Sequence, residues 1–252
     1  MPNYDNMRVC VPSFQRADQL EKKTLAFLRR VQFPMDRVDV FIADEPDERA
    51  AYEYLNDTEV NVHLGVRGLV HQRLHIVKHY PEGTEVLALD DDIQDVKAKV
   101  GEKKVQSIDS LKQLSTEGFT GCRAANTKLW GIYPTVNAMF MKYRMTFDCR
   151  LIIGAFWGMI VDHDPALQPT MSIKEDYERT VMFYKRFGAI ARLNWYGIVT
   201  KYYGTGGLEH ERTKGEHLIR CKELLERYPQ YITWARTKSY GYAEINFRSP
   251  KR

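Results

Sequence analysis

Short apolar runs alternate with amphipathic stretches along the first third of the chain. Four of these runs have the length and composition of β-strands: 7–12, 38–43, 60–64 and 85–89. Between the runs, apolar residues recur at helical spacing. One helix is expected to begin at Ala17 or Asp18, a short one to end near Leu55, and one to follow Gly68. This alternation predicts a parallel sheet that is covered by helices.

The second half of the chain has a less regular pattern and is rich in aromatic residues. In chain order we expect a short helix, two antiparallel strands, a strongly amphipathic helix, a strand and a last helix, at 108–114, 130–143, 144–161, 173–187, 189–203 and 215–228. A glycine-rich loop is expected at 204–207. No linker rich in proline, glycine and serine divides the chain, so residues 1–252 are expected to form one α/β domain.

Three consecutive carboxylates follow the strand expected at 85–89. Asp90, Asp91 and Asp92 would repel one another at close range unless a cation lies among them. Their oxygen atoms are suitable ligands for Mg²⁺ or Mn²⁺, ions that proteins usually share with substrate phosphates. The alternative is an exposed acidic turn that binds nothing.

Polar residues also follow the first two expected strands, and parallel sheets bind ligands beyond the carboxyl ends of their strands. The residues that should meet the three aspartates along this edge are Ser13, Arg16, Asp44 and Glu45. Asp44 and Glu45 have a simpler alternative role, because acidic residues ahead of a helix beginning at Pro46 commonly cap it. The alternative for Arg16 is a place at the start of the next helix, without a ligand.

The composition is that of a globular enzyme, with 44% hydrophobic and 28% charged residues, which argues against disorder. The longest apolar run, 151–161, is too short to cross a bilayer, so no membrane insertion is expected. Residues 1–5 lack the basic and apolar segments of a secretion signal, which favours the cytoplasm. The cysteines, at positions 10, 122, 149 and 221, are scattered as in proteins with reduced core thiols.

The net charge of +4 is too small to indicate a nucleic-acid partner by itself. Basic residues are nevertheless concentrated in the last fifth of the chain: Arg212, Lys214, Arg220, Lys222, Arg227, Arg236, Lys238, Arg248, Lys251 and Arg252. This distribution favours contact with a polyanion, and its alternative is a solvated surface.

Four short motifs stand in the order in which inverting GT-A glycosyltransferases carry them. They are Val-Pro-Ser-Phe-Gln-Arg at 11–16, the acidic pair at 44–45, Leu-Asp-Asp-Asp at 89–92 and Lys-Glu-Asp-Tyr at 174–177. The chain resembles these enzymes over 7–203. The resemblance implies a Rossmann-type α/β sandwich, with a mostly parallel central sheet, helices on both faces and an antiparallel acceptor-side extension. It divides the chain into a donor-binding half (7–100), an acceptor-binding half (101–210) and a basic segment (211–252).

Within this fold, the compact size, the Asp-Asp-Asp-Ile form of the motif and the Gly-Thr-Gly-Gly segment at 204–207 resemble the TET-associated glycosyltransferases. Members of that family occur in phages and kinetoplastids and glycosylate hydroxymethylated pyrimidines in DNA. The resemblance implies a UDP-sugar donor, a Mn²⁺ or Mg²⁺ cofactor and double-stranded DNA with 5-hydroxymethylcytosine as acceptor. It also implies location in the host cytoplasm if the protein is of phage origin. The sugar, the choice between hydroxymethylcytosine and hydroxymethyluracil, and the oligomeric state stay open.

The resemblance assigns roles to particular residues. Asp92 would bind the metal directly, Asp90 would support the ion or contact ribose, and His210 or His217 would complete the metal site. Asp176, with Glu175 beside it, would be the base that takes the proton from the acceptor hydroxyl; the alternative is an acidic first helical turn that interacts with the helix dipole. Further donor contacts would come from Pro12, Ser13, Arg16, Asp44, Glu45, Arg67 and Asp91, and acceptor contacts from Gly154 and Trp157.

Three alternatives remain. A glycosyltransferase of this fold can act on a polysaccharide, a lipid or a protein instead of DNA. An inactive module of the same fold can bind nucleic acid, although it would have little reason to keep Asp90, Asp92 and Asp176. A nucleotidyltransferase is disfavoured, because its glycine-rich first loop with a lysine is missing at 13–16.

Overall fold

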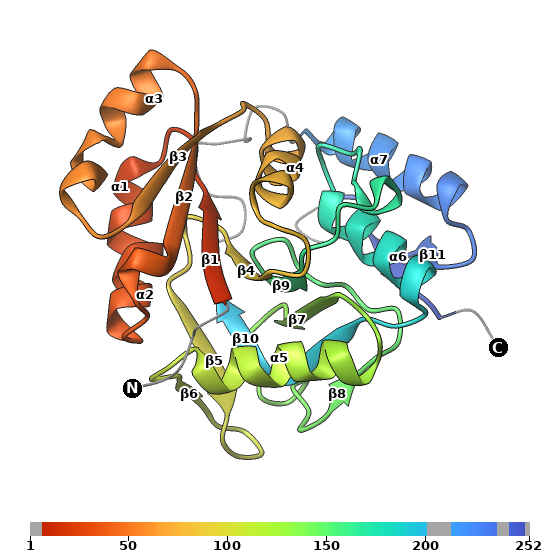
Figure 1. Cartoon of the computed structure of the whole chain (residues 1–252). Helices are drawn as coiled ribbons and strands as arrows, with labels where there is room; N and C mark the ends of the chain where they lie inside the picture. Colours follow the sequence, from red (N-terminus) through yellow and green to blue (C-terminus); the bar gives the residue numbers. More distant parts are fainter. Residues whose placement is uncertain (1–6, 201–212, 236–241, 250–252) are drawn as a thin grey trace.

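The computed structural model describes residues 7–200, 213–235 and 242–249 (Figure 1). The first half contains β1 (Met7–Pro12), α1 (Ala17–Gln19), the π-helix η1 (Leu20–Leu25), α2 (Ala26–Arg30), η2 (Met35–Arg37), β2 (Val38–Ala43), α3 (Pro46–Ala51), η3 (Glu53–Asp57), β3 (Asn61–Gly65), α4 (Leu69–His79), β4 (Glu85–Leu89), β5 (Asp95–Lys99) and β6 (Val105–Ser107). The second half contains α5 (Lys112–Ala124), β7 (Leu129–Tyr133), β8 (Met145–Thr146), β9 (Phe156–Ile160), η4 (Pro165–Leu167), α6 (Glu175–Phe187), β10 (Ala191–Val199), α7 (Lys214–Arg227), β11 (Ile232–Trp234) and β12 (Ile245–Phe247).

One sheet joins both halves of the chain, in the strand order β3-β2-β1-β4-β9-β7-β10-β5-β6. The strands β3, β2, β1 and β4 are parallel, and β9 runs antiparallel to both β4 and β7. Strands β7 and β10 are parallel, whereas β5, β6 and β8 add antiparallel edges. The predicted α/β sandwich with an antiparallel extension is confirmed, and its parallel half brings the ends of β1, β2 and β4 to one edge.

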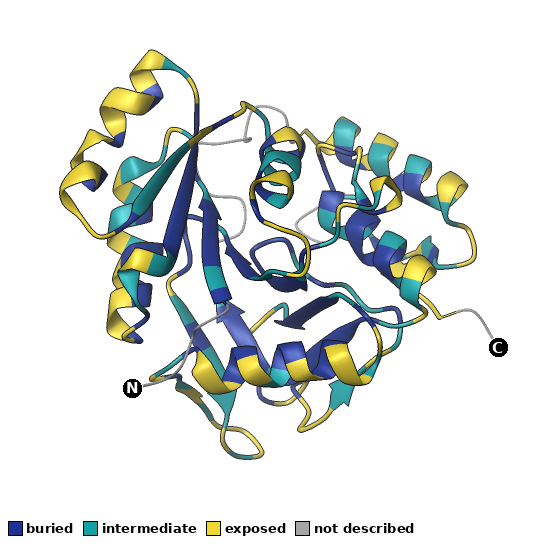
Figure 2. Ribbon diagram, in the orientation of Figure 1, coloured by how far each residue is buried: buried dark blue, intermediate teal, exposed yellow. Residues whose placement is uncertain are grey.

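Helices cover both faces of this sheet, because consecutive strand residues point to opposite sides. Val9 and Val11 of β1 pack in one cluster with Leu28 of α2 and Phe119 of α5. Cys10, between the two valines, belongs to a second cluster that includes residues of α4 and α6. Figure 2 shows buried strands between helices whose outer sides are exposed. All four cysteines are buried and unpaired, as the sequence predicts.

A third apolar cluster joins α6 to α7 and to the small β11–β12 sheet. Val181 of α6 packs there with Cys221 and Leu224 of α7. The rings of Tyr177 and Phe247 stack with centroids 5.2 Å apart. The amphipathic helix expected at 173–187 is therefore confirmed, and both of its sides are covered by protein.

Several expected boundaries are wrong. Residues 108–111 are not helical; the helix there is α5, which begins at Lys112 and runs to Ala124. The strand expected at 130–143 ends at Tyr133, and the apolar run 151–161 forms a strand only from Phe156 to Ile160. Strands β5 and β6 were not expected, because their lysines and other polar residues suit an exposed sheet edge and give no apolar signal. No helix of the described residues has the length and apolar character needed to cross a membrane.

The indole ring of Trp130 packs in the core directly against two glycines. It is fully buried on β7, directly opposite Gly158 of β9. A Cβ atom at Gly158 would lie 2.1 Å from Trp130 Nε1, and one at Gly118 of α5 would lie 2.3 Å from its Cδ2. The indole ring thus fills the space that side chains at both glycines would need.

The substitution Gly158→Ala should lower the free energy of unfolding by about 1–3 kcal/mol, because the new methyl group forces Trp130 from its position. Urea denaturation followed by circular dichroism measures the change. Gly215→Ala is the matched control: Gly215 is an exposed position of α7 with open space around it, so no loss is expected. An equal loss in both variants, or none at Gly158, would contradict this packing.

Candidate functional site

The three aspartates form a tight turn directly after β4, and the π-helix η1 holds this turn in place. Thr24 of η1 is fully buried. Its hydroxyl group donates to the carbonyl oxygen of Asp90 at 2.7 Å and accepts from the amide of Ile93 at 2.9 Å. Single π-helical turns often occur at functional sites. Thr24 lies at an inward-facing position of the helix, so the sequence pattern does not indicate its polar role.

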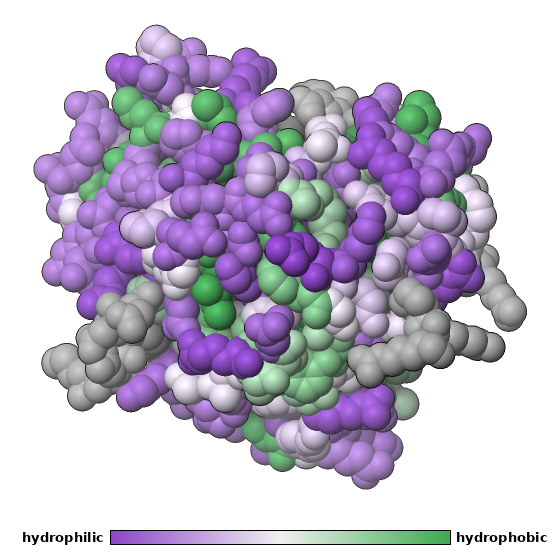
Figure 3. Space-filling model, turned by 45° about the vertical axis from the view of Figure 1, so that its right-hand side comes forward, coloured by the Kyte–Doolittle hydropathy of each residue, from purple (hydrophilic) through white to green (hydrophobic). Residues whose placement is uncertain are grey.

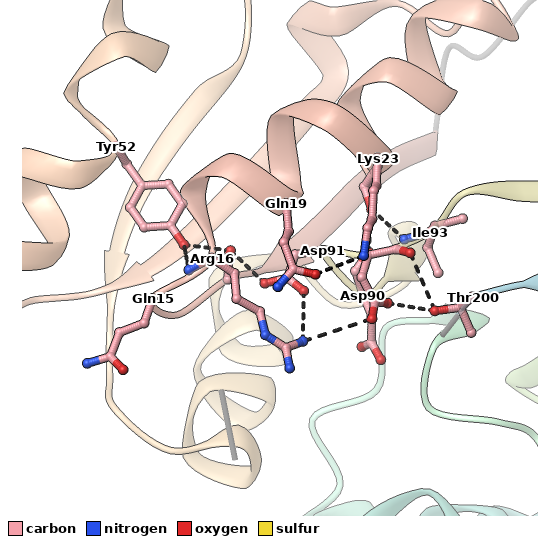
Figure 4. Close-up of polar contacts among 12 residues, drawn as sticks. Gln15, Arg16, Gln19, Lys23, Tyr52, Asp90, Asp91, Ile93 and Thr200 are labelled. Atoms are coloured by element: carbon pink, nitrogen blue, oxygen red, sulfur yellow. Dashed lines mark hydrogen bonds and ion pairs between the residues drawn. The ribbon is translucent and has the colours of Figure 1, made fainter. Parts of the chain in front are cut away.

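Each aspartate has different partners (Figure 4). Asp90 is the most exposed of the three, with 36% of its side-chain surface accessible. Asp91 is buried and accepts a hydrogen bond from Ser13 Oγ at 2.7 Å. Asp92 accepts one from Thr200 Oγ1 at 2.7 Å. Asp90 is therefore the accessible member of the turn, whereas Asp91 and Asp92 are both buried.

Asp91 anchors the loop that follows β1. Ser13 Oγ lies 2.6 Å from the hydroxyl of Tyr52, which also accepts from the amide of Arg16 at 3.2 Å. Arg16 Nη1 lies 3.4 Å from Asp91 and 4.0 Å from Asp92. Burial raises the pKa of Asp91 to about 7, although Ser13 and Arg16 stabilise its charged form. Ser13 and Arg16 thus meet the aspartates, as the sequence predicts.

Arg73 of α4 connects the aspartate turn to the start of α6. Its Nη2 lies 3.0 Å from Asp90 Oδ1 and donates to the carbonyl oxygen of Gly154 at 3.0 Å. Its Nη1 forms an ion pair with Glu175, which also accepts from Arg179 Nη1 at 2.8 Å. Segments that are distant in the sequence are thereby brought together around one buried guanidinium group.

No sequence motif assigns a role to Arg73, although its position in the helix carries a signal. Arg73 lies three residues after Val70 and four before Val77, on the apolar side of the helix. An arginine at such a position is buried and needs carboxylate partners. The pattern alone does not identify those partners, because both come from elements far along the chain.

Glu175 and Asp176 have different surroundings. Glu175 is buried and forms ion pairs with Arg73 and Arg179, so it connects these two arginines. Asp176 is half-buried, and its Oδ2 accepts from the amide of Gly154 at 3.1 Å. A Cβ atom at Gly154 would lie 3.0 Å from both Arg73 Nη1 and Glu175 Oε1. A glycine at this position therefore lets the ion pair approach the chain.

A pocket of about 250 Å³ of empty space opens beside this junction. Asp90, Gly154 and Trp157 line it, together with Arg73 and Pro12. Two residues expected to contact the acceptor, Gly154 and Trp157, thus lie beside two expected to contact the donor, Pro12 and Asp90. The assignments of these residues as ligands of a substrate stay predictions.

The other expected donor residues lie on the exposed side of the same edge. Asp44 pairs with Arg49 at 2.7 Å, and Glu45 lies 3.5 Å from Arg67. The guanidinium group of Arg67 lies 5.3 Å from the ring centroid of Phe14. Glu45 is the N-cap residue of α3 but makes no side-chain capping bond. The capping alternative for this acidic pair is therefore not seen.

The predicted histidine ligands are not brought to the aspartates in the part of the chain that the structure describes. His217 lies on α7, buried, with its ring 4.6 Å from that of Tyr242. Among residues 7–200, 213–235 and 242–249, no three His, Cys, Asp or Glu side chains form a group that could hold a metal ion. His210 and the glycine-rich loop 204–207 lie outside the described residues.

Comparison with known proteins places the fold. No protein-family model and no curated protein matches the chain. Among solved structures, the mannosyltransferase PcManGT from Pyrobaculum calidifontis, in complex with GDP-Man and Mn²⁺, matches with a TM-score of 0.57 at 14% identity, over 90% of this chain and 64% of that one. Staphylococcus aureus TarS 1–349 matches with a TM-score of 0.52 at 14% identity, over 87% and 65%.

The glucosyl-3-phosphoglycerate synthase from Mycobacterium tuberculosis, in complex with Mn²⁺, UDP and glucosyl-3-phosphoglycerate, gives a TM-score of 0.54 at 10% identity. That match covers 98% of this chain and 88% of the synthase. The chain spans slightly less than two thirds of TarS 1–349 and of the mannosyltransferase. At these identities the similarity establishes the fold, which is that of the GT-A glycosyltransferases.

The substitution Thr24→Val should loosen the aspartate turn, because it removes both hydrogen bonds of the hydroxyl group while keeping the shape of the side chain. We expect a loss of about 1–3 kcal/mol in the free energy of unfolding, measured by urea denaturation. Thr24→Ser keeps the hydroxyl group and should retain most of the stability. If Thr24→Val and Thr24→Ser had the same free energy of unfolding, the hydroxyl group would not stabilise the turn.

Proposed function

We propose that the protein is a metal-dependent glycosyltransferase that takes its sugar from a nucleoside diphosphate sugar. The observation that carries this proposal is the junction around Arg73, which joins the aspartate turn to Gly154 and Glu175 beside one pocket. A transferase needs a donor diphosphate and an acceptor hydroxyl within reach of each other. The GT-A fold and its Mn²⁺-containing neighbours support the same conclusion.

The turn offers two carboxylates, which would hold a hard divalent cation only together with the phosphates of the donor. Asp90 and Asp92 offer carboxylate oxygen atoms, which suit Mn²⁺ or Mg²⁺, and Asp92 would be the direct ligand. The bound ion would neutralise the charge that develops on the departing nucleoside diphosphate. Ser13 and Arg16 lie beside the turn and would contact the nucleotide. Arg73 keeps Asp90 in place through its ion pair.

Asp176 is the group proposed to accept the proton of the acceptor hydroxyl. The amide of Gly154 holds one of its oxygen atoms, which fixes the carboxylate beside the pocket. Among the residues that the structure describes, the second oxygen accepts only from the amide of the next residue, Tyr177, at 3.0 Å. A base held in this way supports direct, inverting displacement at the anomeric carbon. Trp157 lines the pocket and would contact the acceptor.

For the acceptor we propose 5-hydroxymethylcytosine in double-stranded DNA, as in the TET-associated glycosyltransferases that the sequence resembles. The basic residues of 211–252 support this choice, and Lys214 and Lys222 of α7 are exposed. Arg220 and Arg227 instead pair with glutamates of the protein. Protein, lipid and polysaccharide acceptors are the alternatives to be tested beside DNA.

The substitution Asp92→Asn should weaken Mn²⁺-dependent binding of UDP by about tenfold or more, because it removes the charge of the direct ligand. Isothermal titration with and without Mn²⁺, using UDP and GDP, measures the effect and identifies the base preference. Asp18→Asn is the control, since Asp18 is exposed and pairs only with Lys22 at 2.7 Å in the described structure. An affinity for UDP that is the same with and without Mn²⁺, and the same in Asp92→Asn, would contradict the proposed site.

If modified DNA is the acceptor, release of UDP from a panel of UDP-sugars with Mn²⁺ should require DNA that contains 5-hydroxymethylcytosine. Asp176→Asn should reduce this release by about 10²-fold or more, because a general base contributes on that order, whereas nucleotide affinity should be kept. Unmodified DNA of the same sequence is the control. Release at the same rate without DNA would retain the enzyme class and reject this acceptor.

A further inference from the structure

A second pocket lies on the far side of Arg73 and Trp157, between α4 and α6. Its empty space is about 450 Å³, a volume that includes the open solvent at its mouth. Apolar side chains make up most of its wall: Val70, Leu74, Val77, Met159, Leu167 and Phe183. Its charged part consists of Arg73, Asp162, Glu175 and Arg179. The face of the molecule seen in Figure 3 is largely hydrophilic, with apolar areas in limited parts of it.

Arg179 has hydrogen-bonding capacity that the described residues leave unused. Only 4% of its side-chain surface is accessible, and Nη1 donates to Glu175 Oε2 at 2.8 Å. Its Nε and Nη2 have no hydrogen-bond acceptor among the residues that the structure describes. Nε and Nη2 lie on the same side of a guanidinium group and together form the fork that binds a carboxylate or a phosphate through two parallel bonds. A buried fork without an acceptor is unfavourable and indicates a missing partner.

The surroundings keep this fork in one orientation. The guanidinium carbon of Arg179 lies 3.8 Å from the ring centroid of Trp157, so the indole ring covers one face of the group. Glu175 fixes its third nitrogen. Trp157 Nε1 is also buried and lacks an acceptor within the described residues. Arg179 lines the pocket and thus keeps a buried fork in one orientation beside an apolar wall.

We propose that the pocket between α4 and α6 binds a small organic anion, whose carboxylate or phosphate group is held by Nε and Nη2 of Arg179 and whose apolar body lies against the wall of the pocket. The acidic residues of the pocket do not serve as acceptors for Nε and Nη2 of Arg179. Glu175 is occupied by Arg73 and Arg179, and Asp162 pairs with Lys128 at 2.8 Å.

Binding in this pocket is connected to the aspartate turn. The anion would contact Arg179, which forms an ion pair with Glu175. Glu175 forms a second ion pair with Arg73, and Arg73 in turn pairs with Asp90. The ligand can therefore be part of the acceptor or a separate effector, and both have the same recognition chemistry. The binding itself does not depend on the proposed glycosyl transfer.

The test uses benzoate and phenyl phosphate as probes, titrated calorimetrically into the full chain, with benzamide as the neutral control. At least one anion should bind with a dissociation constant of about 1 mM or tighter, as expected for ligands of this size, and benzamide should not. Arg179→Lys keeps the positive charge but removes the fork, so it should weaken the anion about tenfold or more. Arg186→Lys, at an exposed position of the same helix, should leave the affinity unchanged.

A second variant tests the location. Val77→Phe places a larger side chain in the apolar part of the pocket and leaves the fork intact, so it should also reduce binding. Thermal unfolding of each variant confirms that it is folded. No binding to the wild-type chain, equal affinity in Arg179→Lys, or undiminished affinity in Val77→Phe would each overturn the proposal.

The source of the ligand is distinguished with 4-(hydroxymethyl)benzoate, which carries both an anion and a hydroxyl group. Transfer of a sugar to it, detected by mass spectrometry, identifies the anion as part of the acceptor. Binding without transfer that alters the affinity for Mn²⁺ and UDP identifies an effector. Failure of all glycosyl transfer, with binding of the probe intact, would reject the proposed function and leave the anion site standing.

Discussion

The ion pairs of Arg73 are the constraint on which the site depends. Asp90 and Glu175 come from the end of β4 and the start of α6, and without a cation between them two carboxylates would repel at this junction. Burial lowers the pKa of Arg73 to about 10, which still leaves the guanidinium charged at neutral pH. Its bond to the carbonyl oxygen of Gly154 adds the chain ahead of β9 to the same centre.

The same arginine separates two pockets with different surroundings. On one side, the pocket beside Asp90 lies next to the proposed metal ligands and Asp176. On the other side, the larger pocket is mostly apolar and contains the fork of Arg179. Trp157 belongs to both pockets. Ligands in the two pockets would therefore interact with one buried charge network, so that binding in one pocket would change the affinity of the other.

The sequence predicted the parallel half of the fold well, because apolar runs and helical spacing are local signals. The strands β5 and β6 at one end of the sheet were missed, since a strand such as Asp95–Lys99 with alternating lysines does not differ locally from a loop. The aspartate turn and its meeting with Ser13 and Arg16 follow from the rule that parallel strands end at one edge. The roles of Thr24, Arg73 and Arg179 depend on tertiary contacts, which no local pattern contains.

The central claim is that the aspartate turn, held by Thr24 and Arg73, is the binding site of a metal–nucleotide complex. A crystal structure of the protein with Mn²⁺ and UDP tests it most directly. The account predicts Mn²⁺ on Asp92, the diphosphate on the metal, the nucleotide beside Ser13, and Arg73 still between Asp90 and Glu175. Nucleotide bound at another place, with no metal at the aspartate turn, would contradict it.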